Sequence, residues 1–219
     1  MDVITGTTRH LSSEMYEQLS RYRYQVFIDM LGWELPTQHG LERDQFDHDD
    51  TVHVIIRNDQ GAISGYGRLL PTSQPYLLGD VFPQLLNGLP PPCSQDIWEL
   101  SRFAAVDFNS QTSSAAGQFS SPVAVRLLQE AILCARTHGA RRIITVSPVG
   151  VERLLRRAGF QAHRAGPPMM VGRHPIFACW IECDATKQTA SHPEILSAIR
   201  PEPHELHPQQ ANRSSSIIG

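Results

Sequence analysis

The sequence predicts an α/β protein, with a mixed central β-sheet and helices packed on it. β-Branched runs alternate with segments in which apolar residues recur at helical spacing. The expected order is a hairpin, a strand, a helix, a strand, a helix and further strands, which places antiparallel and parallel neighbours in one sheet. A chain of 219 residues is also long enough for one domain with a sizeable core.

The first helix is expected from near Glu14 to about Leu31, with Ser12 or Ser13 as its cap. Its apolar positions recur at helical spacing: Met15, Leu19, Tyr22 and Val26. The stretch from Gly32 to Asp50 is polar and irregular, so it predicts a long surface loop. Long loops in compact domains are often functional.

Residues 51–57 and 62–70 predict a β-hairpin, because two β-branched runs flank a turn that ends in glycine. Gly65 and Gly67 lie inside the second run, where glycine indicates a bulge or the close approach of a ligand. The segment DIWELSRFA, residues 96–104, predicts the next strand.

The second half of the domain begins with a strong helix at residues 121–138, with Ser121 ahead of Pro122 at its start and Gly139 as its stop. The other expected elements are a strand at 141–147, a shorter helix at 148–159 that starts with Pro148, and strands at 160–164 and 175–183. We expect residues 1–184 to form one domain, and the polar tail, residues 185–219, to be partly disordered.

Composition excludes several classes of protein. No apolar stretch reaches the roughly 18 residues of a membrane helix, and the first residues lack the pattern of a secretory signal. The four cysteines show no Cys-x-x-Cys spacing and the ten histidines no H-E-x-x-H pattern. We therefore expect a cytoplasmic protein without disulfides or a metal site.

Charge is distributed unevenly along the chain. Residues 1–120 hold 15 acidic and 7 basic side chains, whereas residues 121–173 hold 2 acidic and 9 basic ones. An acidic half beside a basic segment indicates two binding surfaces of opposite sign. Two solvated faces of opposite charge would give the same pattern.

Six charged residues stand on apolar or glycine-rich backgrounds: Arg23, Asp44, Asp47, Arg68, Glu99 and Arg102. Burying a charge is costly unless it is paired, so these side chains should balance one another if their elements converge. Strand alternation would point Glu99 and Arg102 to opposite faces. Both can serve one site only if the strand bends near Ser101 or ends there. A buried salt-bridge network without a substrate is the alternative.

Four segments carry a family resemblance: RYRYQVFIDMLGWELP, ERDQFDHDDT, GYGRLLPTSQPYLLGDVF and WELSRFAA. Together they resemble the acyl-homoserine-lactone synthases of bacterial quorum sensing over roughly residues 10–184. Nine positions match the family pattern: Arg23, Phe27, Trp33, Asp44, Asp47, Arg68, Phe82, Glu99 and Arg102.

The resemblance implies a fold similar to the N-acetyltransferases (GNAT-like) and a reaction between S-adenosylmethionine and an acyl chain on acyl carrier protein. Amide formation would be followed by lactone closure with release of methylthioadenosine. S-adenosylmethionine is then a substrate, and no cofactor is expected. Nucleic acid and membrane insertion have no place in this interpretation.

The resemblance also implies roles for the matched residues. The catalytic candidates are Glu99, as the base for the substrate amine, with Arg68, Asp44 and Arg102. The S-adenosylmethionine-binding candidates are Arg23, Phe27, Trp33, Asp47, Phe82 and Arg102. Glu99 and Arg102 are expected to be both used in the site and paired, because arginine forks bind carboxylates and acidic groups favour a sulfonium.

Two further groups of candidates lie in the basic half. The family resemblance places Thr145 and Ser147 at the acyl pocket, although Ser147 could simply cap the helix expected to start at Pro148. The docking surface expected for the acidic carrier protein consists of Arg141, Arg142, Arg153, Arg156 and Arg157. An ordinary solvated helix face, with Glu152 and Arg156 paired four residues apart, is the alternative.

Two other functions are alternatives to the synthase. A GNAT-type N-acyltransferase using acyl-coenzyme A would carry an R/Q-x-x-G-x-G/A turn for the pyrophosphate, and the junction VDFNSQTSSAAGQFSSP has none. A nucleic-acid patch on the basic segment would need aromatic interleaving or a binding motif, and neither is present.

Overall fold

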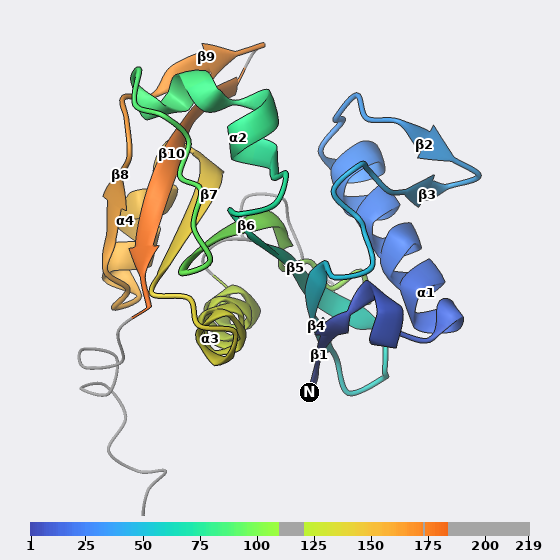
Figure 1. The fold of residues 1–219 in the computed structure, drawn as a ribbon. Coiled ribbons are helices and arrows are strands. Elements are labelled where there is room, and N and C mark those ends of the chain that lie inside the picture. Colours follow the sequence, from blue (N-terminus) through green and yellow to red (C-terminus); the bar gives the residue numbers. More distant parts are fainter. Residues whose placement is uncertain (110–120, 173, 184–219) are drawn as a thin grey trace, which may run out of the picture. The chain divides into compact units, whose positions relative to one another are not determined.

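The computed structural model describes residues 1–109, 121–172 and 174–183 (Figure 1). These residues belong to one compact unit, Met1–Ala185. The predicted C-terminal tail, 185–219, lies outside the described residues and its disorder stays a prediction. No helix of the described part combines the length and apolar character needed to cross a membrane.

A mixed β-sheet forms the centre of this unit and confirms the predicted fold class. Its strands follow the order β1-β4-β5-β6-β7-β10-β8, and β9 pairs with β10. Their bounds are β1 Asp2–Thr7, β4 Val52–Arg57, β5 Ile63–Pro71, β6 Ile97–Ala104, β7 Arg142–Pro148, β8 Ala162–Arg164, β9 Met169–Val171 and β10 His174–Glu182. The pair β6 and β7 is parallel and the other recorded pairs are antiparallel.

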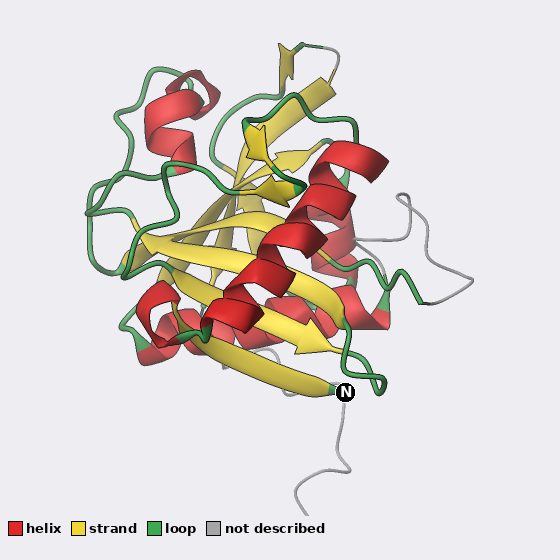
Figure 2. Cartoon of the chain, turned by 90° about the vertical axis from the view of Figure 1, so that its right-hand side faces the viewer, coloured by secondary structure: helices red, strands yellow, loops and turns green. Residues whose placement is uncertain are grey.

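Helices cover both faces of the sheet. The helical segments are η1 Thr8–His10, α1 Ser13–Arg23, the π-helical η2 Tyr24–Met30, α2 Leu77–Val81, η3 Pro83–Leu86, α3 Pro122–Thr137 and α4 Val151–Arg157. The first part of the chain, α1 and η2, packs against Ile55 and Tyr66, and α2 packs near Leu70. Side chains alternate along β5, so Leu69 points to the face opposite to Leu70. Leu69 packs with α3, and α3 therefore covers that opposite face (Figures 1 and 2).

The first helix has the predicted extent but not a uniform geometry. Ser12 caps it, because its hydroxyl accepts a 3.2 Å hydrogen bond from the amide of Met15. After Arg23 the helix widens into π geometry, in which the amide of Leu31 reaches the carbonyl of Val26. π-Helical turns are rare and occur often at functional sites.

The stretch from Gly32 to Asp50 was predicted as a surface loop, and this prediction is wrong in one respect. It contains a short hairpin, β2 Thr37–Gln38 and β3 Leu41–Glu42, and it folds inward. Glu42 is fully buried and Phe46 is 3% exposed. The polar composition hid this burial, because arginines from other elements neutralise the carboxylates of the loop.

The space beside the two glycines of β5 is filled by the protein's own side chains and is not left for a ligand. A Cβ on Gly67 would lie 3.0 Å from Leu100, and a Cβ on Gly65 would lie 3.4 Å from Val123 of α3. The bulge predicted in β5 is confirmed next to Gly65, because Ile56 of β4 pairs with Gly65 whereas Arg57 pairs with Ile63, which leaves one extra residue in β5.

The start of α4 also differs from the prediction. Pro148 ends β7 and pairs with β10, and the helix begins at Val151 after Gly150, which has a φ of 103°. Ser147 therefore lies in a strand and caps no helix. Proline at the first turn of a helix is a frequent sign of a helix start, but here Pro148 is the last residue of a strand.

Candidate active site

A β-bulge in β6 brings Arg102 to the α1 side of the sheet. Tyr66 pairs with Ala104 and Arg68 pairs with Ser101, so β6 carries one more residue than β5 over this stretch. Arg102 has a φ of 53°, a backbone conformation that non-glycine residues adopt at a cost of about 1 kcal/mol or more. The bend expected near Ser101 is thus present. Because of it, the side chains of β6 do not simply alternate between the two faces of the sheet.

Three arginines and three carboxylates meet beneath α1 and η2. The cluster consists of Arg23, Arg68, Arg102, Glu42, Asp44 and Asp47. Asp47 accepts from Arg23 at 2.8 Å and from Arg68 at 2.9 Å. Asp44 accepts from Arg68 at 2.5 Å and from Arg102 at 2.7 Å. We call these six residues the charge cluster.

Opposite charges in the charge cluster balance, but the hydrogen bonds do not use every donor. The Nη2 atoms of Arg23 and Arg68 are buried and have no hydrogen-bond partner among the described residues. Asp44 is the most open member, with a side chain 13% exposed, whereas the other five side chains are 4% exposed or less. A ligand would therefore meet Asp44 first.

Electrostatics keep Asp47 and Arg68 of the charge cluster ionised. Burial would raise the pKa of Asp47, but the charges of Arg23 and Arg68 outweigh burial and hold that pKa well below its usual range. Burial likewise opposes the charge on Arg68, yet Asp47 and Asp44 raise the pKa of its guanidinium above the ordinary value. For both groups, the effect of ion pairing on the pKa is thus larger than the effect of burial.

Two aromatic rings lie beside the charge cluster. Phe27 and Trp33 stack with their centroids 4.9 Å apart, and the guanidinium of Arg102 lies 5.5 Å and 5.8 Å from the two ring centres. Phe27 is 1% exposed and belongs to the core, whereas Trp33 is 39% exposed. Trp33 is therefore the ring that a ligand can reach.

Glu99 lies on the same sheet face as the charge cluster but points toward α2. Its carboxylate accepts from the amides of Leu77 at 3.0 Å and Leu78 at 2.7 Å. Burial raises the pKa of Glu99, and the two amides, Arg68 and the Ser101 hydroxyl oppose that rise in part. The Ser101 hydroxyl also accepts from Arg68 at 3.1 Å, so it links Glu99 to the charge cluster.

The structure does not pair Glu99 with Arg102. Among the described residues, the ion-pair partners of Arg102 are Glu42 and Asp44. Phe82 stands apart as well: it follows α2 and packs with the apolar residues around Leu78. The nine matched positions thus divide into the charge cluster with its rings and a second group at α2.

Thr145 and Ser147 are both buried in β7. They alternate with Ile144 and Val146, which pack on the α2 side, so Thr145 and Ser147 face the α3 side. The pairing of β6 with β7 ends at Glu99 and Ile144. Both predicted acyl-pocket residues therefore lie beyond the last paired position, where the strands are no longer joined.

The five predicted docking arginines do not lie on one face. Arg142 lies 4.0 Å from the centre of the Trp180 ring and pairs with Glu182, on the sheet face opposite to α4. Arg156 pairs with Glu152 at 2.5 Å, which is the alternative that the sequence left open. Arg141, Arg153, Arg156 and Arg157 are exposed, and Arg142 is half-buried. A basic surface here would have to wrap around the edge strand β8.

Sequence reasoning missed Glu42. It is fully buried and binds Arg23 at 2.5 Å and Arg102 at 3.0 Å. The available signal was its position, since it stands two residues before Asp44 in the same acidic loop.

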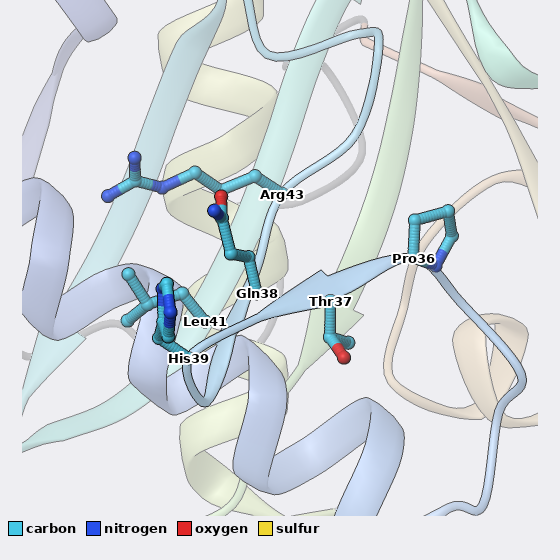
Figure 3. A pocket seen from close by; sticks show the side chains of 6 residues that line it. All are labelled: Pro36, Thr37, Gln38, His39, Leu41 and Arg43. Carbon is cyan, nitrogen blue, oxygen red and sulfur yellow. The ribbon is translucent and has the colours of Figure 1, made fainter.

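A separate hollow of about 280 Å³ lies along the β2–β3 hairpin (Figure 3). Its lining consists of Pro36, Thr37, Gln38, His39, Leu41 and Arg43. None of the predicted site residues lines it. In the described ranges, no group of three or more His, Cys, Asp or Glu side chains could hold a metal ion.

Comparison with known proteins assigns the chain to a family. The family described as autoinducer synthase matches residues 7–190. The chain belongs to the autoinducer synthase family. An acyl-homoserine-lactone synthase from Acinetobacter nosocomialis is 54% identical over 182 residues, which cover 83% of this chain and 100% of that relative. The chain is accordingly an acyltransferase of the acyl-homoserine-lactone synthase type.

Solved structures of autoinducer synthases share the fold. TofI, in a ternary complex with an inhibitor and MTA, is 41% identical with a TM-score of 0.73, over 85% of this chain and 94% of TofI. LasI is 32% identical with a TM-score of 0.75, over 85% of this chain and 92% of LasI. An acyl-CoA N-acyltransferase from Pseudomonas aeruginosa, at 18% identity and a TM-score of 0.52, shares the fold alone, over 82% of this chain and 97% of that one. The predicted GNAT-like architecture is confirmed.

Proposed function

We propose that this synthase joins an acyl chain to the amine of S-adenosylmethionine and then closes the lactone. The observation that carries the proposal is the balanced charge cluster beside an exposed tryptophan, with Glu99 held on the same sheet face. The complex of TofI with MTA supports it, because methylthioadenosine is what remains of S-adenosylmethionine after ring closure.

Recognition of S-adenosylmethionine follows from its charges. The ligand carries a sulfonium, an ammonium and a carboxylate. Asp44 is the open carboxylate of the charge cluster and would attract the cationic groups, while Trp33 offers a ring face to the sulfonium. Arg102 and Arg23 would bind the carboxylate, and Arg23 has a donor free for it at Nη2.

Amide formation requires an unprotonated amine. A free α-amine has a pKa of about 7.7–8.0, so most of it is protonated at neutral pH. Glu99 is the proposed base. Its two oxygens each accept one backbone amide and keep a further lone pair. Burial already raises the pKa of Glu99, which favours uptake of the amine proton as attack proceeds.

The proposed reaction has two bond exchanges. In the first, the amine nitrogen bonds to the thioester carbon and gives a proton to Glu99; the carbon–sulfur bond then breaks, and the departing thiolate takes that proton from Glu99 and leaves as a thiol. In the second, a carboxylate oxygen of the ligand attacks the carbon beside the sulfonium, and the bond to sulfur breaks. A sulfonium and a carboxylate are consumed and neutral products form, so a buried site assists this step.

The acyl donor would reach the amine where β6 and β7 part. The two strands pair only as far as Glu99 and Ile144, so a thioester arm could enter beside Glu99. Thr145 and Ser147 lie just beyond, toward α3, and we propose that they border the acyl chain. The amine and the chain would then approach from opposite faces of the sheet.

We propose acyl carrier protein as the donor, on the strength of the basic residues of α4. Acyl-coenzyme A is the second candidate, because MesI, a CoA-dependent acyl-homoserine lactone synthase, is 28% identical to this chain with a TM-score of 0.70. The segment that would carry a pyrophosphate-binding turn includes residues 110–120, which lie outside the described residues.

The proposal is tested with purified protein. S-adenosylmethionine is titrated by calorimetry, and acyl carrier protein and coenzyme A carrying one acyl chain are compared as donors, with mass spectrometry of the lactone and methylthioadenosine formed. Lactone formation with release of one methylthioadenosine per lactone supports the proposal. Acyl transfer to another amine without S-adenosylmethionine binding would overturn it. The absence of a cofactor and a cytoplasmic location stay predictions.

A further inference from the structure

We propose that Glu42 is a positioning residue, which fixes Arg23 and Arg102 relative to each other for binding S-adenosylmethionine. This inference rests on the proposed function. No motif pointed to Glu42, and it need not touch the substrate: its role is to hold the two arginines that do.

The contacts of Glu42 show a bridge between two elements. One carboxylate oxygen accepts from Nε of Arg23 at 2.5 Å. The other accepts from Nη2 of Arg102 at 3.0 Å and from its Nε at 3.3 Å. Each oxygen thus holds one guanidinium, and the carboxylate sets the distance between the two.

Among the described residues, Glu42 is the carboxylate that hydrogen-bonds both arginines, whereas Asp44 lies 2.7 Å from Arg102 but 4.0 Å from Arg23. Arg23 is the last residue of α1, where the helix turns into π geometry. Arg102 stands at the bulge of β6 with a φ of 53°. Glu42 reaches both from the end of β3, whose partner strand places it opposite Thr37. The β2–β3 hairpin therefore serves as the arm that carries the bridging carboxylate.

Stability alone does not account for a fully buried carboxylate in this place. Buried ion pairs recover little more than their desolvation cost, and apolar residues of similar volume often stabilise a protein as well or better. Apolar residues are common nearby, since Leu41 precedes Glu42 and Phe46 is buried in the same loop. A role in setting the site explains the charge.

Loss of the bridge would affect the ligand in two ways. Without Glu42, three arginines would face two carboxylates, and the surplus positive charge would repel the sulfonium and ammonium. Arg102 would also keep only Asp44 as its ion-pair partner among the described residues. Asp44 is the open carboxylate proposed to meet the ligand, so Arg102 would compete for it.

The test compares Glu42→Gln and Glu42→Asp with the wild type. Gln keeps the shape, but its amide group cannot accept from the second arginine. Asp keeps the charge, but it is one methylene shorter and cannot bridge the same span. We expect the KM and the calorimetric Kd for S-adenosylmethionine to rise about tenfold or more in Glu42→Gln and less in Glu42→Asp, with kcat and the KM for the acyl donor within about threefold of wild type.

The matched control is Glu17→Gln, which removes a carboxylate that pairs with Arg21 on the exposed side of α1. It should leave all parameters unchanged. If Glu42→Gln fails to fold, Glu42→Asp decides with the same readouts. An unchanged KM for S-adenosylmethionine, or an equal loss toward both substrates, would overturn the positioning role. A wild-type protein that does not bind S-adenosylmethionine would instead overturn the proposed function.

Discussion

Glu99 accepts a 2.7 Å hydrogen bond from the backbone amide of Leu78 and so ties the sheet to the start of α2. A second bond, from the amide of Leu77, engages its other oxygen. The proposed base is therefore also the contact that anchors a short helix. Phe82, which directly follows that helix, is placed through the same contact.

Replacing Glu99 by Gln should separate these two roles. A neutral amide avoids the desolvation that raises the pKa of Glu99, and its oxygen can still accept from one backbone amide. We expect the free energy of unfolding to stay within about 1 kcal/mol of wild type, while the single-turnover rate of acylation falls by roughly two to four orders of magnitude. Chemical unfolding and rapid-quench kinetics measure the two quantities.

The control for this variant is Glu130→Gln, which removes a half-buried carboxylate paired with the exposed Arg126 on α3. Acylation by this control should match wild type. Near-wild-type turnover of Glu99→Gln at saturating substrates would show that Glu99 anchors α2 and does no proton transfer.

Trp33→Ala should weaken S-adenosylmethionine binding without affecting the donor. Trp33 is exposed and its ring lies close to Arg102 and the charge cluster. Removing a cation–π face should raise the KM for S-adenosylmethionine about tenfold and leave the KM for the acyl donor within about twofold. Steady-state kinetics with each substrate varied in turn will measure this. Equal changes in both constants would mean that the ring only shields the core.

Phe27→Ala is expected to behave differently, although both aromatics match the family pattern. Phe27 is 1% exposed and packs with Leu19 and Val26. Its truncation should lower the free energy of unfolding by about 3–5 kcal/mol. Denaturant unfolding of the variant checks this, and a stability equal to wild type would show that the ring is not part of the core.

The sequence predicted the sheet and its long helices because their apolar periodicity extends over many residues. It did not predict α2 or β9, which are too short for a period to be visible, or β1, whose sequence DVITGT shows no regular alternation of apolar and polar residues. The resemblance supplied the nine matched positions but not their grouping. Arg102 joins the charge cluster only through a bulge, and strand alternation alone would have sent it to the other face.

Glu42 illustrates the other limit of sequence reasoning. Apart from Leu41, its near neighbours in the chain are mostly polar, so the local pattern predicts exposure. Its burial depends on Arg23 and Arg102, which lie 19 and 60 residues away. Charge neutralisation between distant elements leaves no periodic signal, and only the assembled fold shows it.

His53 should make the stability of the fold sensitive to mild acid. Its ring bonds the hydroxyls of Thr8 at 2.8 Å and Tyr66 at 2.9 Å. Burial lowers the pKa of His53 to about 4; the charge of Asp47 opposes this shift, and the charges of Arg23 and Arg68 add to it. His53 of the unfolded chain therefore takes up a proton near pH 6.5, whereas His53 of the folded protein stays neutral until about pH 4.

The sign follows from this difference. Above pH 7 both states are neutral at His53 and the residue adds no pH dependence. Between pH 7 and pH 5 it should lower the free energy of unfolding by about 2 kcal/mol. His53→Gln should remove that part of the slope in denaturant unfolding, and the exposed His174→Gln should not. Identical slopes for wild type and His53→Gln would contradict the prediction.

The arginines of α4 provide a test of the acyl donor. Arg153 and Arg157 are exposed and have no ion pair within the described residues, whereas Arg156 is taken by Glu152. Free positive charges steer an anionic partner more than paired ones do. The double variant Arg153→Gln, Arg157→Gln is therefore sharper than one that also removes Arg156.

We expect this double variant to lose about tenfold in kcat/KM for acyl carrier protein at low salt and to keep its kcat/KM for a small acyl thioester. The difference should shrink as salt rises, because exposed charges are screened beyond about 10 Å at 0.1 M salt. The control is Arg9→Gln with Arg21→Gln, which removes two exposed charges from the acidic half. An equal loss with both donors, or a loss that salt does not change, would rule out electrostatic docking on α4.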